Sequence, residues 1–285
     1  MQVIPLTPRG FCHGVVNAIH VVKKLASDMA IKRPITVLGM LVHNQAVIDE
    51  LKELGVDTIH NPLKTRLELL DEVTSGTVVI TAHGVSDQVK AKAYEKGLDV
   101  IDATCKDVTK SYEAVKDFLH QGYDILFIGK KNHPEVETVM SYENVYLVEN
   151  KSSLEKISPI NKVAVAHQTT LSLYDVFTLN EAILKKYPDA VIIDEPCDAT
   201  ITRQQAVMNQ PQFIEHCVVV GDSMSHNAQK LVEMSIRQGI PASLVASKEG
   251  LDLNYFKTLK YVSITSAAST PTKLTQEVIE TLKLL

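Results

Sequence analysis

Three of the four cysteines stand at nearly equal intervals along the chain. Cys12, Cys105 and Cys197 are separated by 93 and then 92 positions, and each comes just before a segment that is compatible with a helix. The dipole at a helix N-terminus lowers the pKa of a nearby thiol and so favours the thiolate. Because thiolates bind metals, these three residues are candidate ligands of one metal site. Cys217 lies in the apolar run 217–220 and is expected to be a small buried hydrophobic residue.

Two kinds of metal site fit three thiolates. Zinc is one of them, although zinc sites usually have short ligand spacings and a local histidine. The sequence has no CxxC pair, so the usual zinc-ribbon pattern is missing. The other is a 4Fe–4S cluster, which takes four cysteines when it is fully bound and therefore keeps one open iron when it has three.

The cysteine interval belongs to a longer repeat. Gly39, Gly129 and Gly221 each end a predicted strand and are 90 and 92 positions apart. A polar residue follows each glycine four positions later, and the three are His43, His133 and Ser225. Further predicted strands at 77–80, 163–166 and 261–264 end in polar loops that contain His83, Thr169 and Ser269. Strands that alternate with helices in this way favour parallel sheets.

The repeat predicts an α/β fold of three pseudo-repeated small α/β domains with parallel sheets. The predicted domains are 1–103, with an N-terminal strand and Cys12, then 104–195, and then 196–285. Parallel sheets place their ligand loops at the carboxyl ends of the strands. A trefoil packing around a pseudo-threefold axis would therefore bring the equivalent loops and the three cysteines to one central cavity.

The polar residues of these loops suit an anionic ligand and proton transfer. His43, His83 and His133 lie at predicted loop-to-helix junctions, where helix amides and a cationic imidazole favour phosphate. Glu135, two positions after His133, is a candidate proton relay, and a capping or solvated glutamate is the alternative. Neutral donors of the same loops are Ser225, Asn227 and Ser269. No role is expected for His20, His60, His120 and His216.

Composition and charge exclude several classes of protein. With 45% hydrophobic and 22% charged residues, the chain has the balance of a soluble globular protein. The net charge of −5 and the lack of a basic stripe argue against nucleic-acid binding. No apolar run approaches the ~18 residues of a membrane span, and the start lacks a signal-peptide layout, so we expect a cytoplasmic protein. No Gly-x-Gly-x-x-Gly fingerprint is present, so no bound nicotinamide or flavin is expected.

A series of short motifs over nearly the whole chain resembles one enzyme family. The motifs are PRGFC at 8–12, VHN at 42–44, AHGVS at 82–86, DATC at 102–105, HPEVE at 133–137, QTT at 168–170, AT at 199–200 with RQ at 203–204, and Ser269 before Pro271. In this order they are similar to those of the 4-hydroxy-3-methylbut-2-enyl diphosphate reductases, iron–sulfur enzymes of the non-mevalonate isoprenoid pathway. The resemblance implies a three-domain trefoil around one central 4Fe–4S cluster per chain.

The resemblance also implies a role for each matching residue. Cys12, Cys105 and Cys197 match the cluster ligands, Glu135 matches the proton-delivering acid, and Thr169 matches the threonine beside the substrate hydroxyl. The residues that match the diphosphate site are His43, His83, His133, Ser225, Asn227 and Ser269. The implied reaction is reductive removal of the hydroxyl group at the open iron, which gives isopentenyl and dimethylallyl diphosphate. Electrons would come from an external donor such as ferredoxin or flavodoxin.

Departures from the family pattern leave two other functions open. His226, Met224 and Ala228 change the loop at 222–228, and Ala267 changes the loop at 265–270; Lys106 and His13 also depart beside the cysteines. A divergent iron–sulfur paralogue that acts on another phosphorylated substrate is one alternative. A non-catalytic iron–sulfur sensor is the other, and the retained Glu135 and Thr169 argue against it, because a sensor needs no proton relay.

Overall fold

The computed structural model describes residues 1–158, 160–193 and 197–285. These residues form three four-stranded sheets in which every pair of neighbouring strands is parallel. The predicted fold class, three small α/β repeats with parallel sheets, is thereby confirmed. Contacts divide the chain into two compact units. The first unit is Met1–Val16, Val42–Val47 and Cys197–Leu285, and the second is Asn17–Leu41 and Ile48–Pro196.

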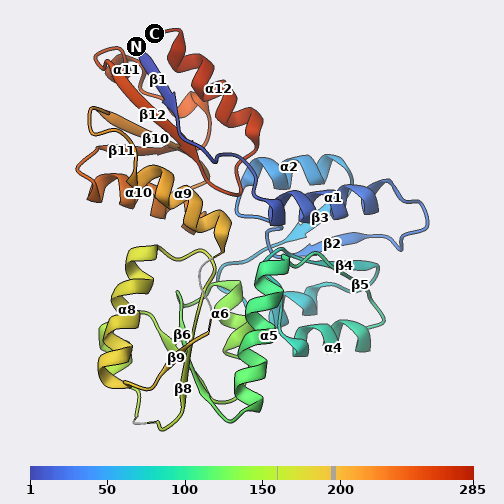
Figure 1. Cartoon of the computed structure of the whole chain (residues 1–285). Helices are drawn as coiled ribbons and strands as arrows, with labels where there is room; N and C mark the ends of the chain where they lie inside the picture. The colour runs from blue at the N-terminus through green and yellow to red at the C-terminus, as the bar shows by residue number, and fades with distance from the viewer. Residues whose placement is uncertain (159, 194–196) are drawn as a thin grey trace. The chain divides into compact units, whose positions relative to one another are not determined.

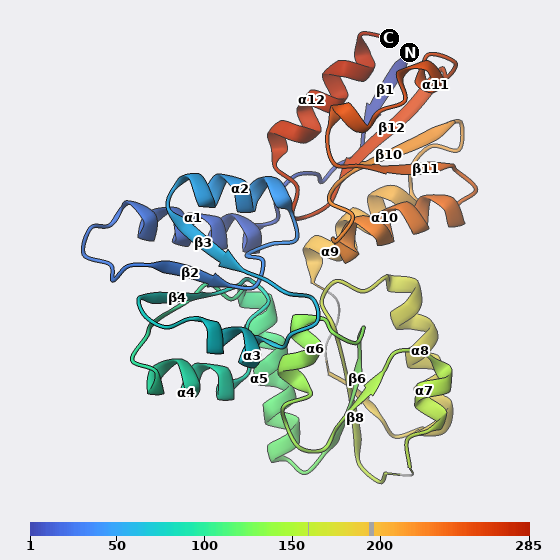
Figure 2. The same cartoon turned by 180° about the vertical axis from the view of Figure 1, so that it is seen from behind.

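The first unit contains one sheet, covered by helices on both faces (Figures 1 and 2). Its strand order is β1 (Gln2–Pro5), β12 (Tyr261–Ser266), β10 (His216–Val220), β11 (Ala242–Val245). Its helices are α9 (Asp198–Met208), α10 (His226–Arg237), α11 (Leu253–Phe256) and α12 (Thr272–Lys283), with a short 3-10 helix at Lys248–Gly250. Alternate residues of β10 point to opposite faces. Val219 therefore packs with α9 and α10, and Val218 packs with α11 and α12.

The second unit contains two sheets (Figure 1). The first has the order β3 (Val56–Ile59), β2 (Ile35–Leu38), β4 (Thr77–Ile80), β5 (Asp99–Asp102). The helices of this repeat are α1 (His13–Ser27), α2 (Gln45–Glu53), α3 (Arg66–Leu69), the 3-10 helix Leu70–Glu72, and α4 (Asp87–Glu95). Leu38, Val78 and Ile80 form a buried core with apolar residues of α3, the 3-10 helix and α4.

The other sheet of this unit repeats the same plan. Its order is β7 (Val145–Val148), β6 (Asp124–Ile128), β8 (Val163–His167), β9 (Val191–Ile192). Its helices are α5 (Lys106–His120), α6 (Pro134–Val139), α7 (Lys151–Glu155) and α8 (Leu173–Lys186). Ile125 and Phe127 pack with α5 and α6, whereas Leu126 and Ile128 pack with α7 and α8. Strands buried on both faces explain why their sequences are continuously apolar.

The N-terminal strand does not belong to the first repeat. The sequence assigns it to domain 1–103, but β1 pairs with β12 and so completes the sheet of the third repeat, a correction to that prediction. The physical reason is that β10, β11 and β12 supply only three strands, and β1 covers the open edge of β12. The predicted boundary at 103/104 falls between β5 and α5. The other, at 195/196, lies outside the described residues.

Two smaller predictions can be compared with the structure. Cys217 is fully buried in the apolar core of the first unit, and burial raises the pKa of its thiol, as expected of an inert core residue. Over the residues that the structure describes, no helix has both the length and the apolar character needed to cross a membrane.

Candidate functional site

The predicted site residues follow the carboxyl ends of central strands in all three sheets. His43 follows β2, His83 follows β4, His133 follows β6, Thr169 follows β8, Ser225 follows β10 and Ser269 follows β12. These are the ends at which parallel sheets hold ligands. The first unit contains Cys12, His43, Cys197, Ser225, Asn227 and Ser269, and the second contains His83, Cys105, His133, Glu135 and Thr169.

Two predicted cluster ligands lie in the first unit, each at the start of a helix. The backbone N–H of Cys12 donates to the carbonyl of Ala268 at 3.0 Å, and α1 begins at the next residue. Cys197 is the N-cap of α9, and its Sγ lies 3.3 Å from the hydroxyl of buried Thr200. Both thiols are only partly buried, so they remain accessible to a metal.

Arg203 of α9 lies close to both of these cysteines. Its Nη2 donates to the carbonyl of Gly10 at 2.7 Å, and its Nη1 donates to the carbonyl of Ala199 at 2.8 Å. Burial lowers the pKa of Arg203, while the charges of Cys12 and Cys197 raise it. One buried guanidinium therefore lies near both thiols.

The predicted diphosphate residues of the first unit form one polar group. Ser225 is the N-cap of α10, and its hydroxyl lies 3.4 Å from that of Ser269. The Ser269 hydroxyl also lies within 3.2 Å of the carbonyl oxygen of His43. Asn227 accepts a bond from Ala268 N–H at 3.0 Å, and its buried Nδ2 has no hydrogen-bond partner among the described residues. That amide is a donor available to an anionic ligand.

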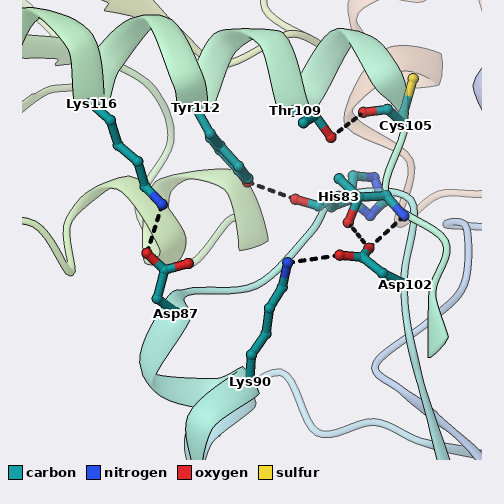
Figure 3. A network of polar contacts seen from close by, with 9 residues as sticks. His83, Asp87, Lys90, Asp102, Cys105, Thr109, Tyr112 and Lys116 are labelled. Atoms are coloured by element: carbon teal, nitrogen blue, oxygen red, sulfur yellow. Dashed lines mark hydrogen bonds and ion pairs between the residues drawn. The ribbon is translucent and has the colours of Figure 1, made fainter. Parts of the chain in front are cut away.

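His83 and His133 lie together in the second unit. Their ring centroids are 5.4 Å apart and the ring planes are almost perpendicular, at 86°. Figure 3 shows Tyr112 extending from α5 toward His83, and its hydroxyl donates to the His83 carbonyl at 2.6 Å. Gly84 follows with a φ of +74°, and a Cβ there would lie 2.8 Å from the Tyr112 ring. The glycine therefore permits both the turn and the close approach of the tyrosine.

Two hydrogen bonds join Thr169 to Glu135. The Thr169 N–H donates to Glu135 Oε2 and its hydroxyl donates to Oε1, both at 2.8 Å. Glu135 is only 1% exposed. His133, the N-cap of α6, accepts the Glu135 N–H at Nδ1 over 3.2 Å. With Nδ1 accepting, the ring presents Nε2–H as its donor. The residues predicted to bind phosphate and to move protons are therefore adjacent in this unit.

Cys105 is held by the turn that precedes it. It is the N-cap of α5, and its N–H donates to the carbonyl of Ala82 at 3.0 Å. Asp102 accepts hydrogen bonds from Thr104 and pairs with Lys90 at 2.7 Å. Figure 3 shows the Lys90 ammonium group turned toward the Asp102 carboxylate. Burial raises the pKa of Asp102, but the bonds from Lys90 and Thr104 outweigh it and keep that pKa below its ordinary value. Asp102 thus stays charged and fixes the turn.

Sequence reasoning missed three residues that shape these surroundings. Arg203 is part of the RQ motif at 203–204 but was not predicted to be a site residue. Tyr112 and Arg66 were not predicted to be site residues either. Arg66 is buried, packs against Gly39, and donates its N–H to Glu137 at 2.6 Å. Burial lowers the pKa of the Arg66 guanidinium. An arginine followed by glutamine after the third cysteine was the one available signal, and the other two gave none.

Comparison with known proteins identifies the family. Residues 3–283 match the model of the LytB protein family. A relative named 4-hydroxy-3-methylbut-2-enyl diphosphate reductase, from Symbiobacterium thermophilum, is 45% identical over 99% of this chain and 97% of its own. The relative of the same name from Brevibacillus brevis is 43% identical over 98% of this chain and 90% of its own.

Solved structures agree with the sequence matches. The structure of the E-1-hydroxy-2-methyl-but-2-enyl-4-diphosphate reductase from Plasmodium falciparum has a TM-score of 0.90 and 33% identity, covering 98% of this chain and 87% of that one. A second structure, of (E)-4-hydroxy-3-methyl-but-2-enyl diphosphate reductase, has a TM-score of 0.71 and 27% identity over the full length of both chains. Sequence and structure together show that this chain belongs to the LytB protein family.

Proposed function

We propose that this chain is a 4-hydroxy-3-methylbut-2-enyl diphosphate reductase. The observation that carries the proposal is the buried Glu135–Thr169 pair beside His133, because a protein that only binds a cluster has no use for a buried carboxylate in a phosphate-binding loop. The relatives that carry this name support it across the length of the chain.

The cysteines fit the cluster that this activity requires. Cys12, Cys105 and Cys197 have partly buried thiols at the starts of helices, which favour thiolates, and Arg203 supplies a cation near two of them. We propose that these three residues hold one 4Fe–4S cluster per chain. When bound, the cluster supplies electrons one at a time and an open iron that polarises the substrate's carbon–oxygen bond.

The remaining residues orient the substrate and exclude water. His83 and His133 in one unit, and His43, Ser225, Asn227 and Ser269 in the other, present donors of the kind that a diphosphate needs. Two electrons and two protons are consumed for each turnover. One proton leaves with the hydroxyl group as water, and the other adds to either end of the allylic unit, which gives isopentenyl or dimethylallyl diphosphate.

Glu135 delivers the proton to the departing oxygen, and Thr169 orients the Glu135 carboxyl group. The threonine holds both carboxylate oxygens, so the acid has one fixed position. An external electron donor of the ferredoxin or flavodoxin class and a cytoplasmic location remain predictions from the sequence.

Substrate turnover distinguishes this function from its alternatives. The changed loop at 222–228 still presents Ser225 and Asn227, which favours the reductase over a paralogue with another phosphorylated substrate. Purified anaerobically and given a chemical reductant, the protein should convert 4-hydroxy-3-methylbut-2-enyl diphosphate with a higher kcat/KM than other allylic phosphates. A cluster-loaded protein that prefers another phosphate would be the paralogue, and one that converts none would be the sensor.

A further inference from the structure

We propose that Arg203 is a positioning residue of the metal site, which ties the Cys12 segment to the Cys197 helix and supplies a positive charge that favours the reduced cluster. The inference rests on the function proposed above, and it concerns a residue outside the ligand set. Within the first unit, the guanidinium of Arg203 donates to the carbonyls of Gly10 and Ala199 and not to the predicted substrate residues, so its effect is separable from theirs.

The hydrogen bonds of Arg203 connect two segments of the main chain. It lies six positions after Cys197 on α9, and one guanidinium nitrogen donates to Ala199 on the first turn of that helix. The other donates to Gly10, two positions before Cys12. Gly10 is held in turn through its N–H, which donates to the Ser266 hydroxyl at 2.6 Å. The planar fork of arginine therefore fixes the main chain beside both cysteines at once.

The burial of Arg203, which pairs with no carboxylate among the described residues, also suggests an electrostatic role. Arg203 is 3% exposed, and no carboxylate within the described residues forms an ion pair with it. Its buried Nε has no hydrogen-bond partner there either. Buried charges are normally paired, because removing an unpaired charge from water is costly. Arg203 lies near the thiols of Cys12 and Cys197, so the anionic cluster that they would hold would provide its counter-charge.

The surroundings of the fourth cysteine, Cys217, are different. Cys217 lies among apolar residues, and the side chains that hydrogen-bond to its thiol are those of Ser263 and Ser235. Burial raises the pKa of the Cys217 thiol, and no arginine acts on it. The positive charge is thus placed beside two predicted ligands and not beside the cysteine that serves the core.

A fixed cation near a cluster should make the cluster easier to reduce. Reduction adds one negative charge, and the potential of an iron–sulfur cluster depends on its net charge and its hydrogen-bonded surroundings. Without the Arg203 charge, the ratio of reduced to oxidised cluster at a fixed applied potential should fall about tenfold, which corresponds to a downward shift of about 59 mV for one electron.

The test uses two variants of Arg203 and one matched control. Arg203→Gln removes the charge, Arg203→Lys keeps the charge and loses the fork, and Arg237→Gln removes an exposed arginine that pairs with Glu233 on α10. After anaerobic reconstitution, iron and sulfide per chain, the thermal midpoint and a redox titration followed by electron paramagnetic resonance are measured. We expect the tenfold loss in the glutamine variant, a ratio within about twofold of wild type in the lysine variant, and no change in the control.

Each outcome decides the proposal. A loaded Arg203→Gln protein with the wild-type potential overturns the electrostatic role, and unchanged cluster content and thermal midpoint in both variants overturn the structural role. If Arg203→Gln holds no cluster, Arg203→Lys decides: a wild-type ratio supports the charge, and a tenfold loss overturns it. A wild-type protein that holds no iron would instead contradict the function proposed above, so the two failures are distinguishable.

Discussion

Thr169 holds both carboxylate oxygens of Glu135, one through its backbone N–H and one through its hydroxyl, each at 2.8 Å. The two residues are 34 positions apart in the sequence. Glu135 lies on the first turn of α6, which follows β6, and Thr169 lies in the loop after β8, the strand that pairs with β6. A carboxylate held at both oxygens keeps one orientation. The geometry makes Thr169 the residue that orients the proposed acid.

Thr169→Val should lower kcat about tenfold to a hundredfold, because a hydrogen bond to a charged group contributes ~1.5–3 kcal/mol and one of the two bonds is lost. The cluster content should not change. Steady-state kinetics with a chemical reductant measure this. Thr281→Val on α12, which removes a hydroxyl that donates to the Glu277 carbonyl, is the control and should retain wild-type kcat. A Thr169→Val enzyme with wild-type kcat would show that the backbone bond alone orients Glu135.

Glu135→Gln should lower kcat by about two or more orders of magnitude, because the amide keeps the shape of the side chain and cannot transfer a proton. The protein should fold and load its cluster normally. Pre-steady-state and steady-state turnover measure the loss, and Glu113→Gln, at an exposed position of α5, is the matched control. Near-wild-type turnover would assign proton delivery to another group, with Glu137 the next candidate.

Serine in place of any predicted ligand should deplete the cluster. Cys12→Ser, Cys105→Ser and Cys197→Ser each remove one thiolate and should give protein with little iron and sulfide after anaerobic purification. Cys217→Ser should keep the full complement, because that thiol is buried in the core of the first unit. Equal iron loss from all four variants, or zinc in place of iron in the wild type, would refute the assignment.

Tyr112→Phe should raise KM about five- to tenfold with little change in kcat, since one hydrogen bond contributes ~1 kcal/mol and this one holds the His83 loop. Iron content should stay at the wild-type level. The exposed Tyr94→Phe on α4 is the control. A fall in kcat at unchanged KM would mean that Tyr112 acts on the chemical step instead of on substrate binding.

Protonation of His216 should destabilise the first unit in acid. Burial lowers the pKa of His216 below its ordinary value of 6.5, so the unfolded chain binds the proton more readily. Stability from this group is therefore complete above pH 6.5 and declines as the pH falls through that value towards the folded-state pKa. Chemical denaturation at a series of pH values should show a shallower acid decline in His216→Gln than in wild type. The exposed His20→Gln should decline as wild type does.

Most of the fold was predictable because the central strands are buried and apolar. The strand predicted at 77–80 coincides with β4, and those predicted at 163–166 and 261–264 lie within β8 and β12. β5 and β9 were not predicted, because β5 has aspartates at both ends and β9 has only two residues, both exposed. The partner of β1 could not be read from its four residues, since pairing with β12 joins segments more than 250 positions apart.

The residues of the candidate site were likewise predictable only in part. Repeat spacing pointed to the cysteines and histidines, because equivalent strands end in equivalent loops. It could not indicate Arg203 or Tyr112, whose function lies in contacts with Gly10 and His83 that join different elements. Side chains that hold a site residue in place have no spacing of their own, so they emerge only when the chain is folded.

The most direct test of the central claim is the electron count of a single reaction. Anaerobic wild-type protein is given 4-hydroxy-3-methylbut-2-enyl diphosphate and a titrated chemical reductant, and isopentenyl and dimethylallyl diphosphate are quantified against the electrons consumed. The reductase function predicts both products, at two electrons for each molecule formed. Consumption of electrons by a cluster-loaded protein that forms neither product would contradict it.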